Sequence, residues 1–169
     1  FPFIQGTDCC GEVVNSGDST GEMLVGKRVL VRPCMRTDGF DNPSNHWLGS
    51  DFDGSFAQYL VAPAHEVFPV ACSWSDAELA TIPCAYGTAE NLVHRTGVTA
   101  GDRVLITGAS GGVGSAAVQL VRRRGAQVVA VASRSKHEAL AELGAATLLD
   151  RDTDIVEALG SQSVDVVID

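Results

Sequence analysis

Positive charge is scarce in this 169-residue sequence, where 21 Asp and Glu residues outnumber 12 Lys and Arg residues and give a formal net charge of −9. A protein that binds nucleic acid or an anionic membrane needs a basic surface, so neither is expected to be the main partner. Long apolar runs are also lacking, because no stretch reaches the roughly 18 apolar residues that a membrane-spanning helix requires. The composition, 45% hydrophobic and 20% charged, is that of a globular protein.

The cysteines lack the pattern of a disulfide framework. There are five of them, an odd number, and no two have the C-x-x-C spacing. The simplest interpretation is a set of reduced thiols in a cytoplasmic protein. The sequence also lacks an initiator methionine and stops within a strand-like run, so we expect it to be an internal piece of a longer polypeptide, and the missing signal peptide carries little weight.

The chain has two parts with different sequence patterns. Residues 1–74 hold short Val- and Leu-rich runs between Gly, Pro and Asp, a pattern typical of an antiparallel barrel or sandwich, and residues 36–53 read as a long surface loop. Residues 75–169 alternate strand and helix, which predicts a doubly wound α/β domain with a parallel sheet. Its strands are continuous aliphatic runs, as expected of strands covered on both faces. They are predicted at 104–107, 128–132, 147–149 and 164–168.

The helix ends are marked in the second half. Arginines 122–124 fall in the last turn of the first predicted helix, where cations favour the negative end of the helix dipole. We therefore interpret them as a helix end rather than a binding patch. Ser135 and Glu138 have the spacing of a capping box for the next helix, which Gly144 is expected to end.

A further helical stretch is predicted upstream of these strands, at residues 75–97. Its apolar residues recur with helical spacing. Pro83 and Gly87 are expected to interrupt it, because proline removes a backbone donor and glycine weakens a helix interior.

A glycine-rich turn joins the strand predicted at 104–107 to the helix that follows. Its sequence fits the dinucleotide fingerprint G-x-G-x-x-G, with alanine in the first position. A strand that leads straight into a helix points the free N–H groups of the helix at the crevice above the sheet, and a Cβ at Gly111 would collide with a pyrophosphate there. Gly112 is expected to keep the turn open and Gly114 to let the helix press against the strand. The alternative is a glycine-rich turn without a ligand. The predicted diphosphate-binding residues are Ala109, Ser110, Gly111, Gly112, Val113 and Gly114.

The second strand of the sheet predicts the type of dinucleotide. A carboxylate near the end of this strand normally binds the ribose hydroxyls of NAD, but here the chain continues as Ser133-Arg134-Ser135-Lys136 and no acid occurs before Glu138. Cations with neighbouring hydroxyls suit the 2′-phosphate of NADP(H). We therefore predict NADP(H) as the cofactor, bound by Ser133, Arg134 and Lys136. The alternative is that the two cations belong to a solvated loop.

Several motifs together resemble the medium-chain dehydrogenase/reductase superfamily. They are GSFAQY at 54–59, GTA at 87–89, GDRVLI at 101–106, GASGGVG at 108–114, VQL at 118–120 and LGA at 143–145. The alanine-led glycine motif is most similar to the quinone oxidoreductase and enoyl reductase branches. The resemblance implies part of a GroES-like β-barrel catalytic domain at 1–74 and an incomplete Rossmann domain at 75–169. It also implies an active site in the cleft between them, and a homodimer as the full-length protein.

The resemblance also raises the question of a catalytic zinc. Zinc-dependent members use a histidine where this sequence has Thr7, whereas Cys84 matches the position of a later cysteine ligand. A threonine hydroxyl is a poor zinc ligand beside imidazole or thiolate, and Asp8 would have to replace a ligand. Residues 34–53 contain only Cys34, so the four-cysteine structural zinc lobe is lacking as well. We expect no metal.

Without zinc, the expected reaction is hydride transfer from NADPH to a quinone or to an α,β-unsaturated carbonyl compound, both small-molecule substrates. Charge that develops on the carbonyl oxygen needs a hydrogen-bond donor. The candidate catalytic residues are Tyr59 and Thr88, with Tyr86 as a further hydroxyl. Two alternatives stay open: a zinc-dependent alcohol dehydrogenase, and a catalytically silent NADPH-binding protein with a structural or regulatory role.

Overall fold

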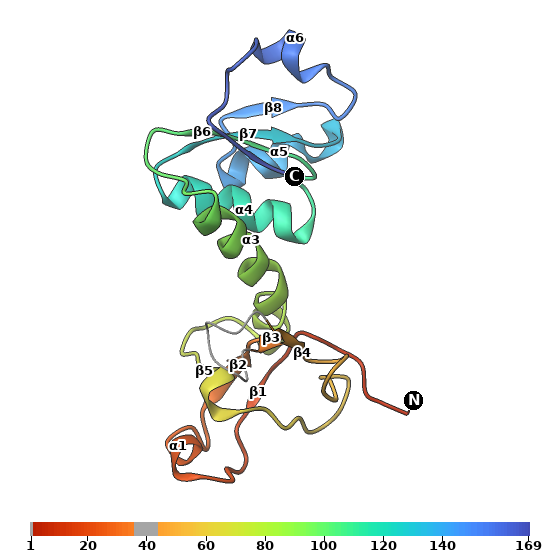
Figure 1. Ribbon diagram of the computed structural model, residues 1–169, viewed down its shortest axis with the longest axis vertical. Helices are drawn as coiled ribbons and strands as arrows, with labels where there is room; N and C mark the ends of the chain where they lie inside the picture. The colour runs from red at the N-terminus through yellow and green to blue at the C-terminus, as the bar shows by residue number, and fades with distance from the viewer. Residues whose placement is uncertain (1, 36–43) are drawn as a thin grey trace. The chain divides into compact units, whose positions relative to one another are not determined.

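The structure is a computed structural model that describes residues 2–35 and 44–169 (Figure 1). The chain divides into two compact units, Phe1–Cys84 and Ala85–Asp169, and the division lies within helix α3 (Pro83–Arg95). The sequence pattern predicts the boundary between the two domains after residue 74. In the structure, the short helix α2 (Asp76–Leu79) follows that position and still belongs to the first unit.

The first unit is built on short antiparallel strands, as its sequence predicts. Strands β1 (Cys10–Glu12), β2 (Arg28–Val31) and β5 (Val67–Pro69) form a sheet of order β1-β2-β5. Strands β3 (Cys34–Met35) and β4 (His46–Trp47) form a second antiparallel pair. The described part of the loop expected at 36–53 thus contains a strand, and 36–43 lie outside the described residues. The core of this unit is Val31, Met35 and Leu48.

Two short helical segments complete this unit. Helix α1 (Ser19–Glu22) is capped by Asp18, whose side chain accepts a hydrogen bond from the Gly21 N–H group. The 3-10 turn η1 (Ala64–Glu66) leads into β5 and buries Glu66, whose carboxylate lies 3.0 Å from the Arg32 guanidinium. A buried carboxylate needs such a partner, because an unpaired buried charge is costly.

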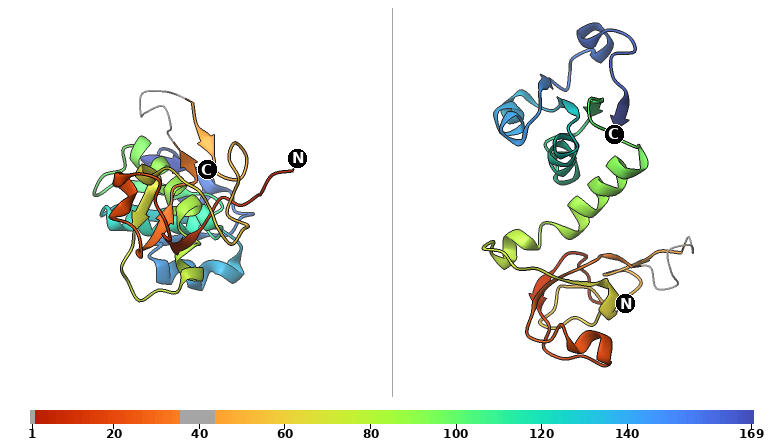
Figure 2. Two further views of the ribbon diagram at one scale, coloured as in Figure 1. Left: turned by 90° about the horizontal axis from the view of Figure 1, so that it is seen from below. Right: turned by 90° about the vertical axis from the view of Figure 1, so that its left-hand side faces the viewer.

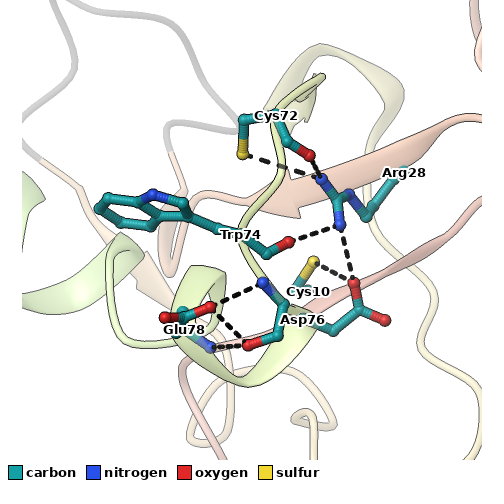
Figure 3. A network of polar contacts seen from close by, with 7 residues as sticks. Cys10, Arg28, Cys72, Trp74, Asp76 and Glu78 are labelled. Atoms are coloured by element: carbon teal, nitrogen blue, oxygen red, sulfur yellow. Dashed lines mark hydrogen bonds and ion pairs between the residues drawn. The ribbon is translucent and has the colours of Figure 1, made fainter.

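Arg28 fastens the chain that leaves β5 to the sheet (Figure 3). Its guanidinium donates to the carbonyl oxygens of Cys72 at 2.5 Å and Trp74 at 2.8 Å, and lies 3.4 Å from the Asp76 carboxylate. The capping box of α2 follows directly, in which Ser75 and Glu78 bond reciprocally. These hydrogen bonds hold the pKa of the Glu78 carboxyl below its usual value. The network fixes where α2 begins.

The second unit is a parallel α/β layer, which confirms the predicted fold class. Strands β6 (Arg103–Ile106), β7 (Gln127–Val131), β8 (Thr147–Leu149) and β9 (Val166–Ile168) are parallel, in the order β8-β7-β6-β9. Within this unit α4 (Gly112–Arg123) and α5 (His137–Leu143) lie side by side on one face of the sheet, and α6 (Ile155–Leu159) lies on the other (Figure 2).

Successive residues of the strands enter two different cores. On β6, Val104 and Ile106 pack with α3, α4 and α5, whereas Leu105 packs with Val129 and with Ile155 of α6. Both faces of the sheet are therefore covered by helices. This explains why the strands have continuous aliphatic runs and no polar alternation.

The helical stretch predicted at 75–97 is interrupted at Pro83, as expected: α2 ends at Leu79, and Pro83 is the first residue of α3, where its missing N–H group costs nothing. Two other predictions about helix boundaries are wrong. Gly87 lies inside α3 without breaking it. Ser135 does not cap the next helix: it lies in a 3-10 turn, η2 (Arg134–Lys136), and α5 has no side-chain cap. The Arg134 N–H group that opens η2 bonds instead to the Asp150 carboxylate at 3.2 Å.

The other predicted helix ends are confirmed. Arg122 and Arg123 occupy the last turn of α4, and Arg124 is its C-cap. Gly144 ends α5 in the left-handed conformation, with a φ of 109°. None of the helices among residues 2–35 and 44–169 is long and apolar enough to cross a lipid bilayer.

Gly114 is expected to be essential for the stability of the second unit. A Cβ built at Gly114 lies 2.3 Å from the Gly108 carbonyl oxygen and 2.7 Å from the Ala109 Cα, both backbone atoms. Gly114→Ala is expected to lower the free energy of unfolding by about 2–4 kcal/mol, because helix and strand must separate. Gly112→Ala is the matched control, since its Cβ meets only the Ala85 Cβ at 3.7 Å. Equal denaturant midpoints for the two variants would contradict this account.

Candidate active site

The glycine-rich turn between β6 and α4 is held by its own backbone. Gly108 has a φ of 54°, and its carbonyl oxygen accepts a hydrogen bond from the Gly111 N–H group at 2.9 Å. The N–H group of Ala109, a fully buried residue, donates to the Val131 carbonyl of β7 at 3.2 Å. Ala109 therefore fastens the turn to the neighbouring strand and offers no free amide. Gly108 is a residue that the sequence analysis missed, although it directly follows the strand.

The first turn of α4 presents free backbone donors. Among the described residues, no hydrogen bond is formed by the N–H groups of Gly112, Val113 and Gly114, whereas Ser115 N–H already bonds to the Gly111 carbonyl at 2.8 Å. Three free amides at the positive end of a 12-residue helix form a site that favours an anion. The turn thus has the donors that a diphosphate group needs.

Gly111 is the glycine with open space beside it. A Cβ at this position would meet only the Gly108 carbonyl oxygen, at 3.4 Å, and the backbone there is extended, with a φ of −78°. The fold itself therefore does not require glycine at 111. Gly111 thus contrasts with Gly114, which packing requires, and its contact with a ligand stays a prediction.

A cavity of ≈ 480 Å³ opens at the carboxyl ends of β6 and β7, next to this turn. The carboxyl edge of a parallel sheet is where nucleotides bind in open α/β folds. Of the cavity-lining residues, the sequence analysis named only Ser110. Arg151 is the second residue after the strand predicted at 147–149, so the rule that sites gather at strand ends would have pointed to it. The lining residues are Thr107, Gly108, Ser110, Val131, Ala132, Arg151 and Ile155.

The segment after β7 carries the cations predicted to select NADP(H). Arg134 is 88% exposed, and its Nε lies 4.0 Å from the Asp150 carboxylate. Lys136 is exposed, and its N–H group bonds to the Ser133 carbonyl at 2.8 Å. The Ser133 hydroxyl accepts a hydrogen bond from the Arg151 guanidinium. No carboxylate lies on the segment that directly follows β7, and the nearby acid, Asp150, comes from the end of β8.

The candidate hydroxyl groups have different surroundings. The Tyr86 hydroxyl accepts a hydrogen bond from Gln119 Nε2 at 2.8 Å, so it takes part in the packing of α3 on α4. Thr88 is exposed on α3, one turn beyond Ala85, which packs beside Gly112 of the glycine-rich turn. Tyr59 is 74% exposed and belongs to the first unit.

Three glycines hold the segment that contains Thr7 and Asp8. A Cβ at Gly49 would lie 2.7 Å from the Gly6 carbonyl oxygen, and one at Gly54 would lie 2.3 Å from the same atom. Gly6 itself has a φ of 107°. The chain crosses itself here at a separation that only glycines allow, and this crossing fixes the position of the two polar residues that follow Gly6.

Asp8 is engaged by hydrogen bonds. Its Oδ1 accepts from the Cys84 N–H group at 2.7 Å, at the start of α3, and its Oδ2 lies 3.4 Å from the Thr7 hydroxyl, which donates to it. Among the residues that the structure describes, no three His, Cys, Asp or Glu side chains come together to hold a metal ion. Thr7, Asp8 and Cys84 therefore do not form a three-ligand set among themselves, and the absence of zinc stays a prediction.

Cys9 and Cys10 of the first unit have thiols with raised pKa values. Burial, followed by the nearby charge of Asp76, raises the pKa of the Cys10 thiol above its usual value. Burial and the neighbouring Cys10 raise the pKa of Cys9.

Comparisons with known proteins agree with this geometry. Residues 1–72 match the family described as alcohol dehydrogenase GroES-like domain, and residues 112–169 match the family described as zinc-binding dehydrogenase. Erythronolide synthase EryA2 of Saccharopolyspora erythraea is 41% identical over 75% of the chain, which covers 4% of that protein. The trans-enoyl reductase himH of Aspergillus japonicus is 29% identical over the whole chain, which covers 50% of it.

A solved structure agrees over the full chain. The putative alcohol dehydrogenase from Sinorhizobium meliloti superposes on 100% of this chain with a TM-score of 0.91 and 40% sequence identity. This chain covers 48% of that structure, so it spans about half of the length of the reductase and dehydrogenase that it matches. The two family matches, the order of the motifs and the parallel sheet lead to one conclusion: the chain belongs to the medium-chain dehydrogenase/reductase superfamily of oxidoreductases.

Proposed function

We propose that the chain is part of an NADPH-dependent oxidoreductase that transfers hydride to a quinone or to an α,β-unsaturated carbonyl compound without zinc. The observation that carries the proposal is the group of free amides at Gly112, Val113 and Gly114, beside the cavity at the carboxyl edge of the sheet. These donors fit the diphosphate of a dinucleotide. The homodimer and the cytoplasmic location remain predictions that accompany this function.

The segment after β7 supports NADPH over NADH. Binding of the NAD ribose normally uses a carboxylate at the end of the second strand, where this chain has Ser133 and Arg134. The nearby Asp150 carboxylate accepts hydrogen bonds from the backbone N–H groups of Arg134 and Asp152. Cations and a hydroxyl at this position suit a phosphate, which a free carboxylate would repel.

Several residues of the chain would position the cofactor and the substrate. The amides of α4 hold the diphosphate, and the open space at Gly111 lets it approach. Thr88, near the glycine-rich turn, is proposed to contact the nicotinamide end, and Tyr59 is proposed to donate a hydrogen bond to the substrate carbonyl oxygen as charge develops on it. Bound NADPH would supply the hydride that the acceptor receives.

The proposal excludes a catalytic zinc because of the chemistry of the donor set. Thr7 stands where zinc-dependent members have histidine, and a neutral hydroxyl is a weak ligand. Asp8 is occupied by Cys84 N–H and by Thr7. The retained Cys84 is the feature that favours the second candidate function, a zinc-dependent alcohol dehydrogenase.

The acceptor class can be tested by turnover of the complete protein. With NADPH, a quinone or a trans-2-enoyl thioester is expected to be reduced at least about tenfold faster than an aldehyde, because no metal polarises a simple carbonyl group. Loss of NADPH absorbance measures each rate. Reduction of the aldehyde alone would contradict the proposal, and tight binding of NADPH without turnover of any acceptor would identify a silent binding protein.

The diphosphate site can be tested at Gly111. Gly111→Ala is expected to keep stability within about 0.5 kcal/mol, because the fold leaves room for the methyl group. It should weaken NADPH binding about tenfold or more, because the methyl group occupies the space of the ligand. Isothermal titration and thermal melting measure the two effects. Gly17→Ala, at an open position of the first unit, is the control. Unchanged affinity at Gly111→Ala would remove the proposed site.

The absence of zinc predicts metal content and chelator sensitivity. Elemental analysis of the complete protein is expected to find far less than one zinc ion per chain, and activity should survive incubation with a chelator. Cys84→Ser should keep activity within about twofold, because the backbone N–H group that bonds to Asp8 remains. Stoichiometric zinc whose removal abolishes activity would establish the alcohol dehydrogenase alternative instead.

A further inference from the structure

Arg151 is a cation inside the cavity that neither the glycine motif nor the segment after β7 includes. It follows β8, and its guanidinium reaches across to the next strand end, where it donates a hydrogen bond to the Ser133 hydroxyl. It also lines the cavity beside Ser110 and Gly108 of the glycine-rich turn. Arg151 therefore connects the strand end expected to hold the adenosine ribose with the turn expected to hold the diphosphate.

The two cations named from the sequence are placed differently. Arg134 is 88% exposed, lies 4.0 Å from the Asp150 carboxylate, and is not among the cavity-lining residues. Lys136 is exposed in the turn that leads to α5 and does not line the cavity either. Within the described parts of the chain, Arg151 forms no ion pair. No carboxylate of the described residues therefore lies within ion-pair distance of its guanidinium.

We infer that Arg151, together with the Ser133 hydroxyl, is the main determinant that recognises the 2′-phosphate of the nucleotide, and that Arg134 has a lesser role. This inference rests on the proposed function. A guanidinium offers two parallel N–H donors to a phosphate, and it binds best where no internal carboxylate competes. Ser133 now holds the guanidinium at the edge of the cavity, and its hydroxyl adds a donor once a phosphate arrives.

Asp150 acts on this site as a positioning residue. Its two carboxylate oxygens accept hydrogen bonds from the N–H groups of Arg134 at 3.2 Å and Asp152 at 3.3 Å. The first bond joins the segment after β7 to the segment after β8, and the second closes a local turn around Arg151. The carboxylate is thereby directed at backbone donors and Arg134, so that the adjacent Arg151 side chain remains available for an anion.

The test measures binding of four probes to the complete protein: NADPH, NADH, 2′,5′-ADP and ADP. Arg151→Gln is expected to weaken NADPH and 2′,5′-ADP at least about tenfold, and to change NADH and ADP less than about twofold, because only the first pair carries a 2′-phosphate. Arg151→Lys should give an intermediate loss, since it keeps the charge without the planar pair of donors. Arg134→Gln should weaken NADPH less than Arg151→Gln does.

Arg123→Gln is the matched control, because Arg123 is an exposed arginine at the end of α4, away from this cavity. Thermal melting of each variant tests for loss of folding, and if Arg151→Gln melts early, Ser133→Ala takes its place with the same expected pattern. If the wild-type protein prefers NADPH and the Arg151→Gln variant retains this preference, the inference about Arg151 is overturned, but the proposed cofactor is not. Equal losses for NADPH and NADH would also overturn the inference about Arg151. A wild-type protein that binds the two cofactors equally would overturn the proposed cofactor and this inference together.

Discussion

The close approach of α4 to the end of β6 determines how the rest of the second unit is arranged. The helix can start at this position only because Gly114 has no Cβ to meet the Gly108 carbonyl oxygen. The short turn that results is closed by the hydrogen bond from Gly111 and is tied to β7 by the amide of Ala109. A turn this short supplies no internal acceptors for the first N–H groups of the helix. The packing contact and the anion site therefore have the same physical origin.

The first unit uses the same principle for a different purpose. Gly49 and Gly54 allow the backbone at Gly6 to pass within contact distance, and this crossing delivers Asp8 to the start of α3. The carboxylate is then used as a helix cap, which leaves it poorly suited to hold a metal. In the proposed reaction without zinc, hydrogen-bond donors would polarise the substrate. In that reaction the cofactor would carry the difficult chemistry.

The local sequence pattern predicted the strands and helices well, but it predicted poorly the contacts between residues that are far apart in the sequence. The aliphatic runs located all four parallel strands, and β8 agrees with its predicted range, because a strand covered on both faces must be apolar throughout. Ser135 was misjudged as a cap because the group that bonds to the Arg134 N–H group, Asp150, comes from the end of the next strand. Arg151 was missed for the same reason: its partner Ser133 is 18 residues away. The roles assigned to the glycine-rich turn, Thr88 and Tyr59 stay predictions.

The acidic character of the chain has to be reconciled with the negative charge of the proposed cofactor, NADPH. A net charge of −9 opposes a ligand with several negative charges at long range, but salt screens charges beyond about 8–10 Å under physiological conditions. At contact distance, the local donors decide. In the proposed site, the free amides of α4 would bind the diphosphate that NADH and NADPH share, so they would not distinguish the two cofactors. The two cofactors differ only in the 2′-phosphate. A site that distinguishes them therefore needs a cation beside this phosphate, and that cation must not already be paired with a carboxylate of the protein. Asp150 is held by backbone amides and lies at the exposed Arg134, so in the proposed site Arg151 would remain available for the phosphate.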